Sequence, residues 1–249
     1  STLQCRATPA EERAYAIFAD MKLDMDIAAH HLTGTLFKTS LEKSLFSSPA
    51  ACIKSIEERL KKLEKRYVND EIGDIAKLRE LKMALDQIDI GSFSRYTRLV
   101  ELLKSSEYCW SAAKSDDRIV MFTERIETMH FLASQLRKDL RLSDAAVPEM
   151  YGGMSDAEQQ QIVEDFGRED SPIRILVASD VASEGINLHY LCHRLIHFDI
   201  PWSLMVFQQR NGRIDRYGQR EQPDIRYFLI SSTNTDIHGD TRILEILIN

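Results

Sequence analysis

The sequence predicts an α/β fold, a parallel sheet flanked by helices, together with an all-helical insertion in the N-terminal half. Short continuous apolar runs, such as residues 173–178 and 194–200, are typical of strands buried on both faces of a parallel sheet. Segments with helical periodicity separate most of these runs, as expected for repeated βαβ units. Between residues 30 and 112 only helical periodicity is present, which distinguishes this region from the sheet.

The first 29 residues are predicted to form a short strand, Thr2–Arg6, followed by a helix. Thr8 is placed to cap that helix and Pro9 to occupy its first position. Two glutamates follow in the first turn, where negative charge favours a helix.

Residues 30–112 are predicted to contain several helices, with breaks around Gly73 and at Gly91-Ser92. Five basic residues interleave with the apolar positions of one of these helices: Arg59, Lys61, Lys62, Lys65 and Arg66. The solvated face of an amphipathic helix is the simpler explanation of this basic cluster, and contact with a DNA backbone or a partner is the alternative.

Five strands are predicted in residues 113–249. They are Arg118–Phe122, Val147–Tyr151 and residues 173–178, 194–200 and 225–231. Helices are expected from Thr123 to Leu140, after Ser155 and after Ser203, and Ser155 and Glu158 have the spacing of a capping box. A loop and then a short helix are expected at the C-terminal end.

Polar and glycine residues follow the ends of several predicted strands, where parallel sheets bind ligands. Ser179, Asp180, Gly185 and Asn187 follow the strand at 173–178. Thr123 and Gly152-Gly153 follow two others, and hydroxyl groups and backbone N–H groups there can contact a nucleic-acid phosphate. The alternatives are helix capping for Thr123 and a tight turn for the glycines.

Arginines are concentrated after Ser203, which is placed to cap the last predicted helix of the sheet region. Spacings of four and three residues predict that Gln209, Arg213 and Arg216 share one helical face. Two guanidinium groups on one face suit a phosphate, because the planar fork matches its oxygens. A solvated basic face is the alternative.

Four segments together resemble the conserved motifs of superfamily 2 helicases and translocases. QQRNGRIDRYGQ resembles motif VI (Q-x-x-G-R-x-x-R), ASDVASEGIN resembles motif V, and RIVMFTE resembles motif IV. YGGMSDAEQQQIVEDF is similar to the strand end and helix that follow motif IV. The ending Tyr217-Gly218-Gln219 and the S-S-P-A element at residues 47–50 are similar to Swi/Snf-type ATPases, in particular the bacterial, RNA-polymerase-associated branch.

This resemblance implies a RecA-like second motor lobe over residues 113–249, a connecting segment over 1–29 and a helical insertion over 30–112. It implies that Arg213 and Arg216 act as arginine fingers and that Gln209 helps to position the attacking water or the γ-phosphate. Gly185 and Asn187 are then expected near ATP. By the same resemblance Ser179 contacts nucleic acid, as do Thr123, Gly152 and Gly153, whereas Arg210 and Asp215 steady the helix or the lobe interface.

No G-x-x-x-x-G-K-[ST] sequence is present, so ATP and Mg²⁺ are expected to be bound mainly by a first lobe of the same polypeptide. The chain by itself is therefore expected to be inactive. The resemblance also implies translocation on double-stranded DNA and remodelling of a nucleoprotein complex, RNA polymerase being one candidate. The alternatives are a strand-separating helicase, a non-catalytic interaction module that retains the fold, and a small-molecule nucleotide enzyme.

Composition limits these possibilities. The net charge of −7 means that any contact with DNA depends on a few placed residues and not on a broad basic surface. No apolar run reaches the ~20 residues that span a bilayer, and the N-terminal residues lack the pattern of a signal peptide. A cytoplasmic protein is therefore expected, and the resemblance implies a bacterial, nucleoid-associated one. No metal site is predicted, because His193 and His197 are too far apart on a strand to share an ion.

Overall fold

The computed structural model describes residues 1–23, 31–66, 73–180 and 186–237. Gly185 and the predicted C-terminal helix therefore lie outside the described residues. The chain forms two compact units. The first contains Ser1–Gln4 and Arg98–Leu229, and the second contains Cys5–Thr97 and the described residues that follow Leu229. The domain limits expected at residues 29 and 112 stay predictions.

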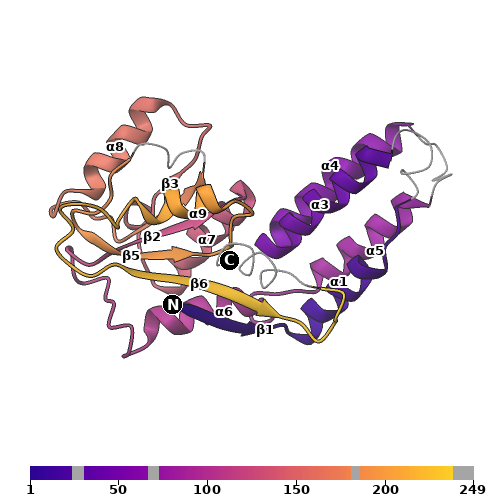
Figure 1. Ribbon diagram of the computed structural model, residues 1–249, viewed down its shortest axis with the longest axis horizontal. Coiled ribbons are helices and arrows are strands. Elements are labelled where there is room, and N and C mark those ends of the chain that lie inside the picture. The colour runs from indigo at the N-terminus through magenta and orange to yellow at the C-terminus, as the bar shows by residue number, and fades with distance from the viewer. Residues whose placement is uncertain (24–30, 67–72, 181–185, 238–249) are drawn as a thin grey trace. The chain divides into compact units, whose positions relative to one another are not determined.

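The first unit is built on a six-stranded sheet with the order β1-β6-β5-β2-β4-β3 (Figure 1). Its strands are β1 (Thr2–Arg6), β2 (Arg118–Thr123), β3 (Glu149–Met150), β4 (Ile175–Ser179), β5 (Cys192–His197) and β6 (Asp224–Ser231). Strand β2 pairs in parallel with both β4 and β5, and the β3–β4 and β5–β6 pairs are also parallel. The predicted parallel sheet is confirmed.

The five strands predicted in residues 113–249 and the strand predicted at Thr2–Arg6 are confirmed, and β1 joins the sheet as a sixth strand beside β6, which the sequence did not predict. The Tyr227 N–H group donates to the Ser1 carbonyl at 3.2 Å. Strand β6 is longer than predicted at its start and offers an open edge, and β1 covers that edge. Pairing of segments more than 200 residues apart leaves no local signal in the sequence.

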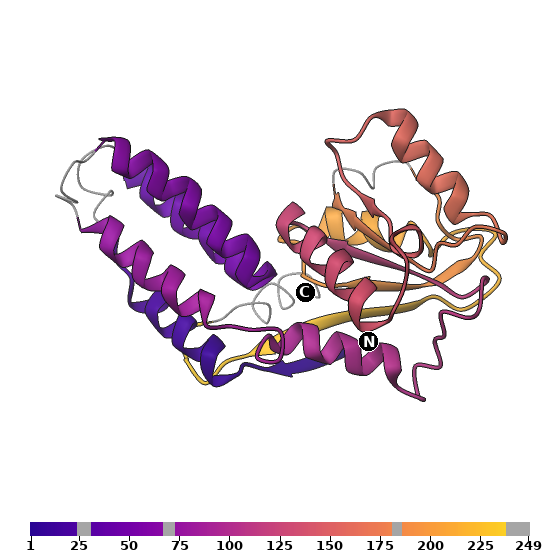
Figure 2. The ribbon, with the colours of Figure 1, turned by 180° about the vertical axis from the view of Figure 1, so that it is seen from behind.

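Helices cover both faces of the sheet. Helix α9 (Leu204–Asn211) lies in front of it in Figure 1, whereas α7 (Ile126–Asp139) lies in front when the molecule is seen from behind in Figure 2. Helix α7 contacts β2, β3 and β4. Side chains alternate along β2, and Val120 and Phe122 belong to the cluster that contains Phe166 of α8 (Asp156–Phe166) and Ile214.

The predicted caps of α8 and α9 are confirmed. The Ser155 hydroxyl accepts from the Glu158 N–H group, and the Glu158 carboxylate accepts from the Ser155 N–H group at 2.8 Å. The Ser203 hydroxyl accepts from the Val206 N–H group at 3.5 Å. These caps satisfy N–H groups that a helix leaves without intrahelical partners.

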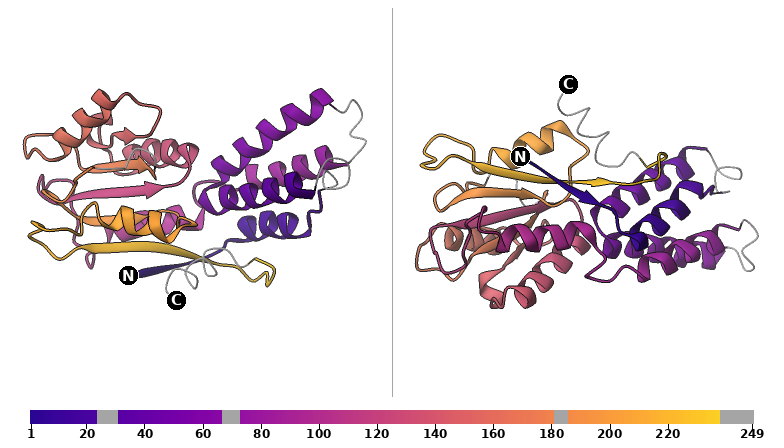
Figure 3. Two further views of the ribbon diagram at one scale, coloured as in Figure 1. Left: turned by 45° about the horizontal axis from the view of Figure 1, so that its top comes forward. Right: turned by 90° about the horizontal axis from the view of Figure 1, so that it is seen from below.

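The second unit is helical, as predicted (Figure 3). Its helices are α1 (Pro9–Asp20), α3 (His31–Ser47), α4 (Pro49–Arg66) and α5 (Asp74–Asp86), and α6 (Ser94–Lys104) begins in it. Neighbouring pairs are α3 with α4, α4 with α5 and α1 with α5. Gly73 has a φ of 69° at the start of α5, which accounts for the predicted break. Among the described residues, no helix is long and apolar enough to cross a bilayer.

A buried acid joins two helices of the second unit. The Glu11 carboxylate of α1 accepts from the N–H group and the hydroxyl of Ser94, both at 3.1 Å. Burial raises the pKa of Glu11, and hydrogen bonds from Thr8 and Ser94 oppose that rise. The Thr8 hydroxyl accepts from the Glu11 N–H group and donates to the Ser92 carbonyl at 2.7 Å, so the predicted cap also holds the loop before α6.

Replacing Thr8 tests this capping contact. We expect Thr8→Ala to lower the free energy of unfolding by about 1–2 kcal/mol, because the cap and the Ser92 contact are lost together. Urea unfolding measures the change, and Thr8→Ser, which keeps the hydroxyl, is the matched control. Equal loss in the serine variant would show that the methyl group and not the hydroxyl stabilises this start of α1.

Candidate functional site at the carboxyl ends of the strands

Three neighbouring strands end together at one edge of the sheet. Thr123 at the end of β2 lies opposite Ser179 at the end of β4, and Phe122 lies opposite His197 at the end of β5. The residues that follow these ends therefore meet at one place, as the sequence predicts. Together with Arg210 of the following helix, four of them form a largely buried polar group that we call the strand-end cluster: Thr123, Asp180, His197, Asp199 and Arg210.

Arg210 is the centre of the strand-end cluster. Its side chain is fully buried, and its Nε and Nη2 atoms donate to the two carboxylate oxygens of Asp180 at 2.5 and 2.8 Å. Its Nη1 atom donates to the Asp199 carbonyl at 2.9 Å, and Nη2 lies 3.6 Å from the Asp199 carboxylate. Arg210 thus joins α9 to the residues that follow β4 and β5, in keeping with the steadying role expected for it.

The charges in this cluster influence one another. Burial raises the pKa of Asp180, and the adjacent Arg210 opposes that rise. Burial lowers the pKa of Arg210, but hydrogen bonding and charge from Asp180, with charge from Asp199, more than compensate, so its pKa lies above the usual value. Arg210 therefore stays charged, and its ion pairs replace the water that it loses.

Thr123 contacts the same cluster. Its hydroxyl is fully buried and donates to Oδ2 of Asp199 at 2.5 Å, while Oδ1 accepts from the Glu124 N–H group at 2.9 Å. Asp199 thereby fixes the end of β2. The phosphate contact expected of Thr123 stays a prediction, and here its hydroxyl faces the protein interior.

His197 completes the cluster in its neutral form. Its Nε2 atom lies 2.8 Å from Oδ1 of Asn211, its Nδ1 atom lies 3.3 Å from Nη1 of Arg210, and its ring stacks on Phe207 at 4.5 Å. Because Arg210 can only donate, Nδ1 accepts and Nε2 carries the proton. Burial, followed by the charge of Arg210, lowers the pKa of His197 to about 3.

Arg213 and Arg216 lie outside the helix, so the prediction that they share a helical face with Gln209 was wrong. Helix α9 ends at Asn211, and residues 212–218, which we call the finger turn, follow it. Ile214 in this turn is fully buried in the core of the sheet unit. Burying an isoleucine contributes about 1.5–3 kcal/mol, and Asn211 and Gly212 favour a helix end, so the turn replaces a further helical turn.

The finger turn is held by the last two residues of motif V, Ile186 and Asn187, and by Leu188. The Nη1 atom of Arg213 donates to the Ile186 carbonyl at 3.3 Å, and the Arg213 carbonyl accepts from the Leu188 N–H group at 3.1 Å. Arg216 is exposed and donates to the side-chain carbonyl of Asn187. The structure therefore brings Arg216 to Asn187, which the resemblance assigns to the same site, and Arg213 to the two neighbours of Asn187.

The remaining predicted residues differ in their surroundings. Gln209 is exposed on α9. Ser179 is 3% exposed, and its hydroxyl has no hydrogen-bond partner among the described residues. Gly152 and Gly153 are exposed in a tight turn, in which the Met154 N–H group donates to the Tyr151 carbonyl at 3.1 Å. Their nucleic-acid contacts stay predictions.

Asp199 and His197 are the members of the strand-end cluster that the sequence does not single out as site residues. Asp199 lies within the apolar run before Pro201, where a carboxylate is unusual, and it is 4% exposed. A buried acid so close to a strand end requires a cationic partner, and Arg210 is the arginine that meets this need.

A parallel sheet with helices on both faces, and arginines beyond the carboxyl ends of its strands, fits a RecA-like lobe. The model of the helicase conserved C-terminal domain matches residues 94–218. The chain belongs to this family.

Two relatives agree with this assignment. The uncharacterized ATP-dependent helicase YqhH of Bacillus subtilis is 25% identical over 248 residues, which are 99% of this chain and 39% of that protein. The RNA polymerase-associated protein RapA of Vibrio campbellii is 30% identical over 125 residues, 50% of this chain and 12% of that protein. The chain thus spans well under half the length of either relative.

The fold is also that of a Swi/Snf-type ATPase. The SWI2/SNF2 ATPase core of Sulfolobus solfataricus matches all of this chain with a TM-score of 0.59 and 20% identity, over 42% of that core. The same core in complex with double-stranded DNA matches with a TM-score of 0.52 over 43% of its chain, again at 20% identity. The RecA-like fold and the resemblance to Swi/Snf-type C-terminal lobes near RapA are confirmed.

The neutral state of His197 predicts a pH dependence of stability. Its pKa is about 3 in the fold and 6.5 as a free side chain, so the unfolded chain binds the additional proton. The stabilisation is present above pH 6.5 and is lost as the pH falls toward 3, by at most about 1.4 kcal/mol per pH unit.

Urea unfolding between pH 7 and pH 4 measures this slope, and we expect His197→Gln to reduce it by one proton equivalent. The control is His193→Gln on the same strand, whose side chain is 21% exposed. An unchanged slope in the His197 variant would contradict the neutral assignment.

Proposed function

We propose that this chain is the second motor lobe of a Swi/Snf-type, ATP-dependent DNA translocase that remodels nucleoprotein complexes. One observation carries the proposal: Arg213 and Arg216 are held on one turn by Ile186 and Asn187, beside the carboxyl edge of a parallel sheet. Arginines placed in this way can complete a nucleotide site that another lobe presents.

The chemistry follows from charge. Phosphoryl transfer places negative charge on the γ-phosphate oxygens and on the leaving group. An arginine finger that stabilises this charge increases the rate by about 10³–10⁵-fold. Arg213 and Arg216 supply two guanidinium groups for this role. Gln209 lies on the last turn of α9, and its amide is suited to orienting the attacking water or the γ-phosphate.

ATP and Mg²⁺ are assigned mainly to a first RecA-like lobe of the same polypeptide. The side chains of Gln209, Arg213 and Arg216 offer hydrogen-bond donors, which suit phosphate oxygens. Gly185 and Asn187 of motif V are assigned to the same nucleotide. Mg²⁺ needs oxygen ligands, mainly carboxylates and phosphates, and this donor set is unsuited to that task. This lobe therefore supplies positively charged groups to the phosphate, and the first lobe binds Mg²⁺.

Double-stranded DNA is the proposed track. The Sulfolobus core, which shares this fold, has been solved with double-stranded DNA. Ser179, Thr123, Gly152 and Gly153 stand at or beyond strand ends on the carboxyl side of the sheet, where they would contact the phosphate backbone. The similarity to RapA makes RNA polymerase the first partner to test, and a cytoplasmic, nucleoid-associated location follows from such a partner.

Replacing Arg213 in the full-length protein tests the finger assignment. We expect Arg213→Ala to reduce DNA-stimulated ATP hydrolysis by about 10³-fold or more. The removed guanidinium stabilises the transition state much more than it stabilises bound ATP. ATP binding, measured by equilibrium titration, should stay close to wild type. The control is Arg220→Ala, which removes an exposed arginine just beyond the motif. Near-normal turnover in the Arg213 variant would refute the assignment.

The isolated chain of 249 residues should release no phosphate from ATP above background, because it lacks a nucleotide cradle. Phosphate release by the purified chain and by its Arg213→Ala variant, compared at equal concentration, measures this. Activity that both proteins share is a contaminant. Activity that the variant loses would show that the chain holds a complete ATPase site.

A further inference from the structure

Arg210 is one residue from Gln209 and six from Arg216, but it is buried and they are exposed. It is fully buried, and its hydrogen bonds are to protein acceptors, whereas Gln209 and Arg216 are exposed. Its guanidinium also lies over the ring of Phe122, 5.8 Å from the centroid. Arg210 therefore spans the end of the central strand β2, with the acids that follow β4 and β5 as its partners.

Both acids that bind Arg210 are linked to a residue with a proposed role. Asp180 directly follows Ser179, whose buried hydroxyl is unsatisfied among the described residues and is proposed to contact a nucleic-acid phosphate. Asp199 holds the end of β2 through Thr123. A phosphate contact at Ser179 or a displacement of Thr123 would therefore move Asp180 or Asp199, the two acids that bind Arg210.

Arg210 also lies close to the finger turn in the sequence, because α9 ends at Asn211 and the turn begins at Gly212. Asn211, the last residue of α9, is bound by His197 of the strand-end cluster, and its carbonyl accepts from the Ile214 N–H group at 3.2 Å. Arg213 follows Gly212 directly. The orientation of α9, which Arg210 holds, thus determines the position of Arg213 in the finger turn.

We propose that Arg210 is a positioning residue that couples DNA contact at the Ser179–Asp180 strand end to the placement of Arg213 and Arg216. The inference rests on the proposed function and adds the element through which DNA stimulates hydrolysis. The planar guanidinium binds both oxygens of Asp180 and the Asp199 carbonyl at the same time, so these hydrogen bonds orient both acids relative to α9. A lysine has the charge but lacks this fork.

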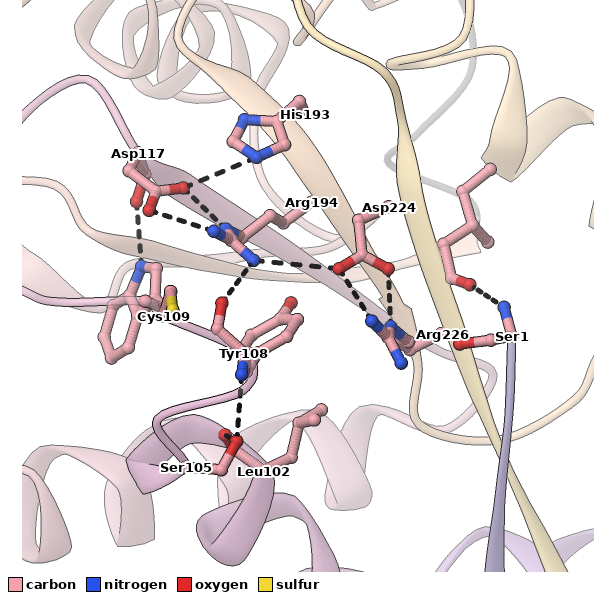
Figure 4. A network of polar contacts seen from close by, with 12 residues as sticks. Ser1, Leu102, Ser105, Tyr108, Cys109, Asp117, His193, Arg194, Asp224 and Arg226 are labelled. Atoms are coloured by element: carbon pink, nitrogen blue, oxygen red, sulfur yellow. Dashed lines mark hydrogen bonds and ion pairs between the residues drawn. The ribbon is translucent and has the colours of Figure 1, made fainter.

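A second buried arginine provides a matched control at the opposite end of β5. Arg194 donates to both carboxylate oxygens of Asp117 at 2.6 and 3.3 Å and to the Tyr108 carbonyl at 2.8 Å (Figure 4). Asp224 lies 3.7 Å from the same guanidinium. This pair resembles Arg210–Asp180 in burial and geometry, but it is at the end of the sheet where no site residue is proposed.

The test compares Arg210→Lys with Arg194→Lys in the full-length protein. The readout is the ratio of ATP turnover with and without double-stranded DNA, at saturating ATP and DNA. We expect Arg210→Lys to lower this ratio by about tenfold or more, a usual size for coupling between two sites. Arg194→Lys should keep the wild-type ratio, even though both variants melt at lower temperature.

Asp180→Asn gives a second, milder variant, because the amide keeps one acceptor for Arg210. We expect it to lower the ratio as well, and we expect the double variant Asp180→Asn with Arg210→Lys to be no lower than the more affected single variant. If Arg210→Lys does not fold, Asp180→Asn alone decides.

Three outcomes would overturn the coupling: a wild-type ratio in Arg210→Lys, a wild-type ratio in Asp180→Asn, or an equal loss in Arg194→Lys. Arg213→Ala separates this failure from failure of the proposed function. If Arg213→Ala abolishes turnover while the Arg210 variant keeps full DNA stimulation, only the coupling is wrong. If Arg213→Ala has normal turnover, the finger assignment itself is wrong.

Discussion

The buried guanidinium of Arg210 is the interaction on which the site depends. A cation without water is stable only when charged partners and hydrogen bonds surround it, and Asp180 and Asp199 provide them. These acids follow two strands that are separated by β2. The ion pairs therefore form only when the three strands are correctly ordered and α9 is seated on their ends, which links the fold to the geometry of the finger turn.

The buried and exposed arginines of this short segment have different roles. Arg210 faces the interior and fixes the segment, Ile214 anchors it in the core, and Arg216 faces solvent beside Asn187. The turn therefore presents charge from a rigid base. Preorganised charge stabilises a transition state effectively, because no reorganisation is required when the phosphate bond breaks. In the proposed function, the lobe completes a nucleotide site that a partner lobe presents.

Much of the fold could be predicted because its strands are continuous apolar runs and its helices begin with recognisable caps. The prediction failed where tertiary packing overrode local pattern. Arg213 and Arg216 have helical spacing from Gln209, but burial of Ile214 favours a turn over a longer helix. The inward direction of Arg210 was equally hidden, since its neighbours are polar too. Asp180 and Asp199, acids placed directly at strand ends, were the available signal.

The affinity of the full-length protein for ADP with aluminium fluoride, which mimics the transferring phosphoryl group, tests the central claim most directly. Arginines that act in the transition state should bind this analogue much more strongly than ADP. Arg216→Ala is therefore expected to weaken the analogue by about 10²-fold or more and to leave ADP affinity unchanged. Equal effects on both ligands, or on neither, would contradict a role for the finger turn in phosphoryl transfer.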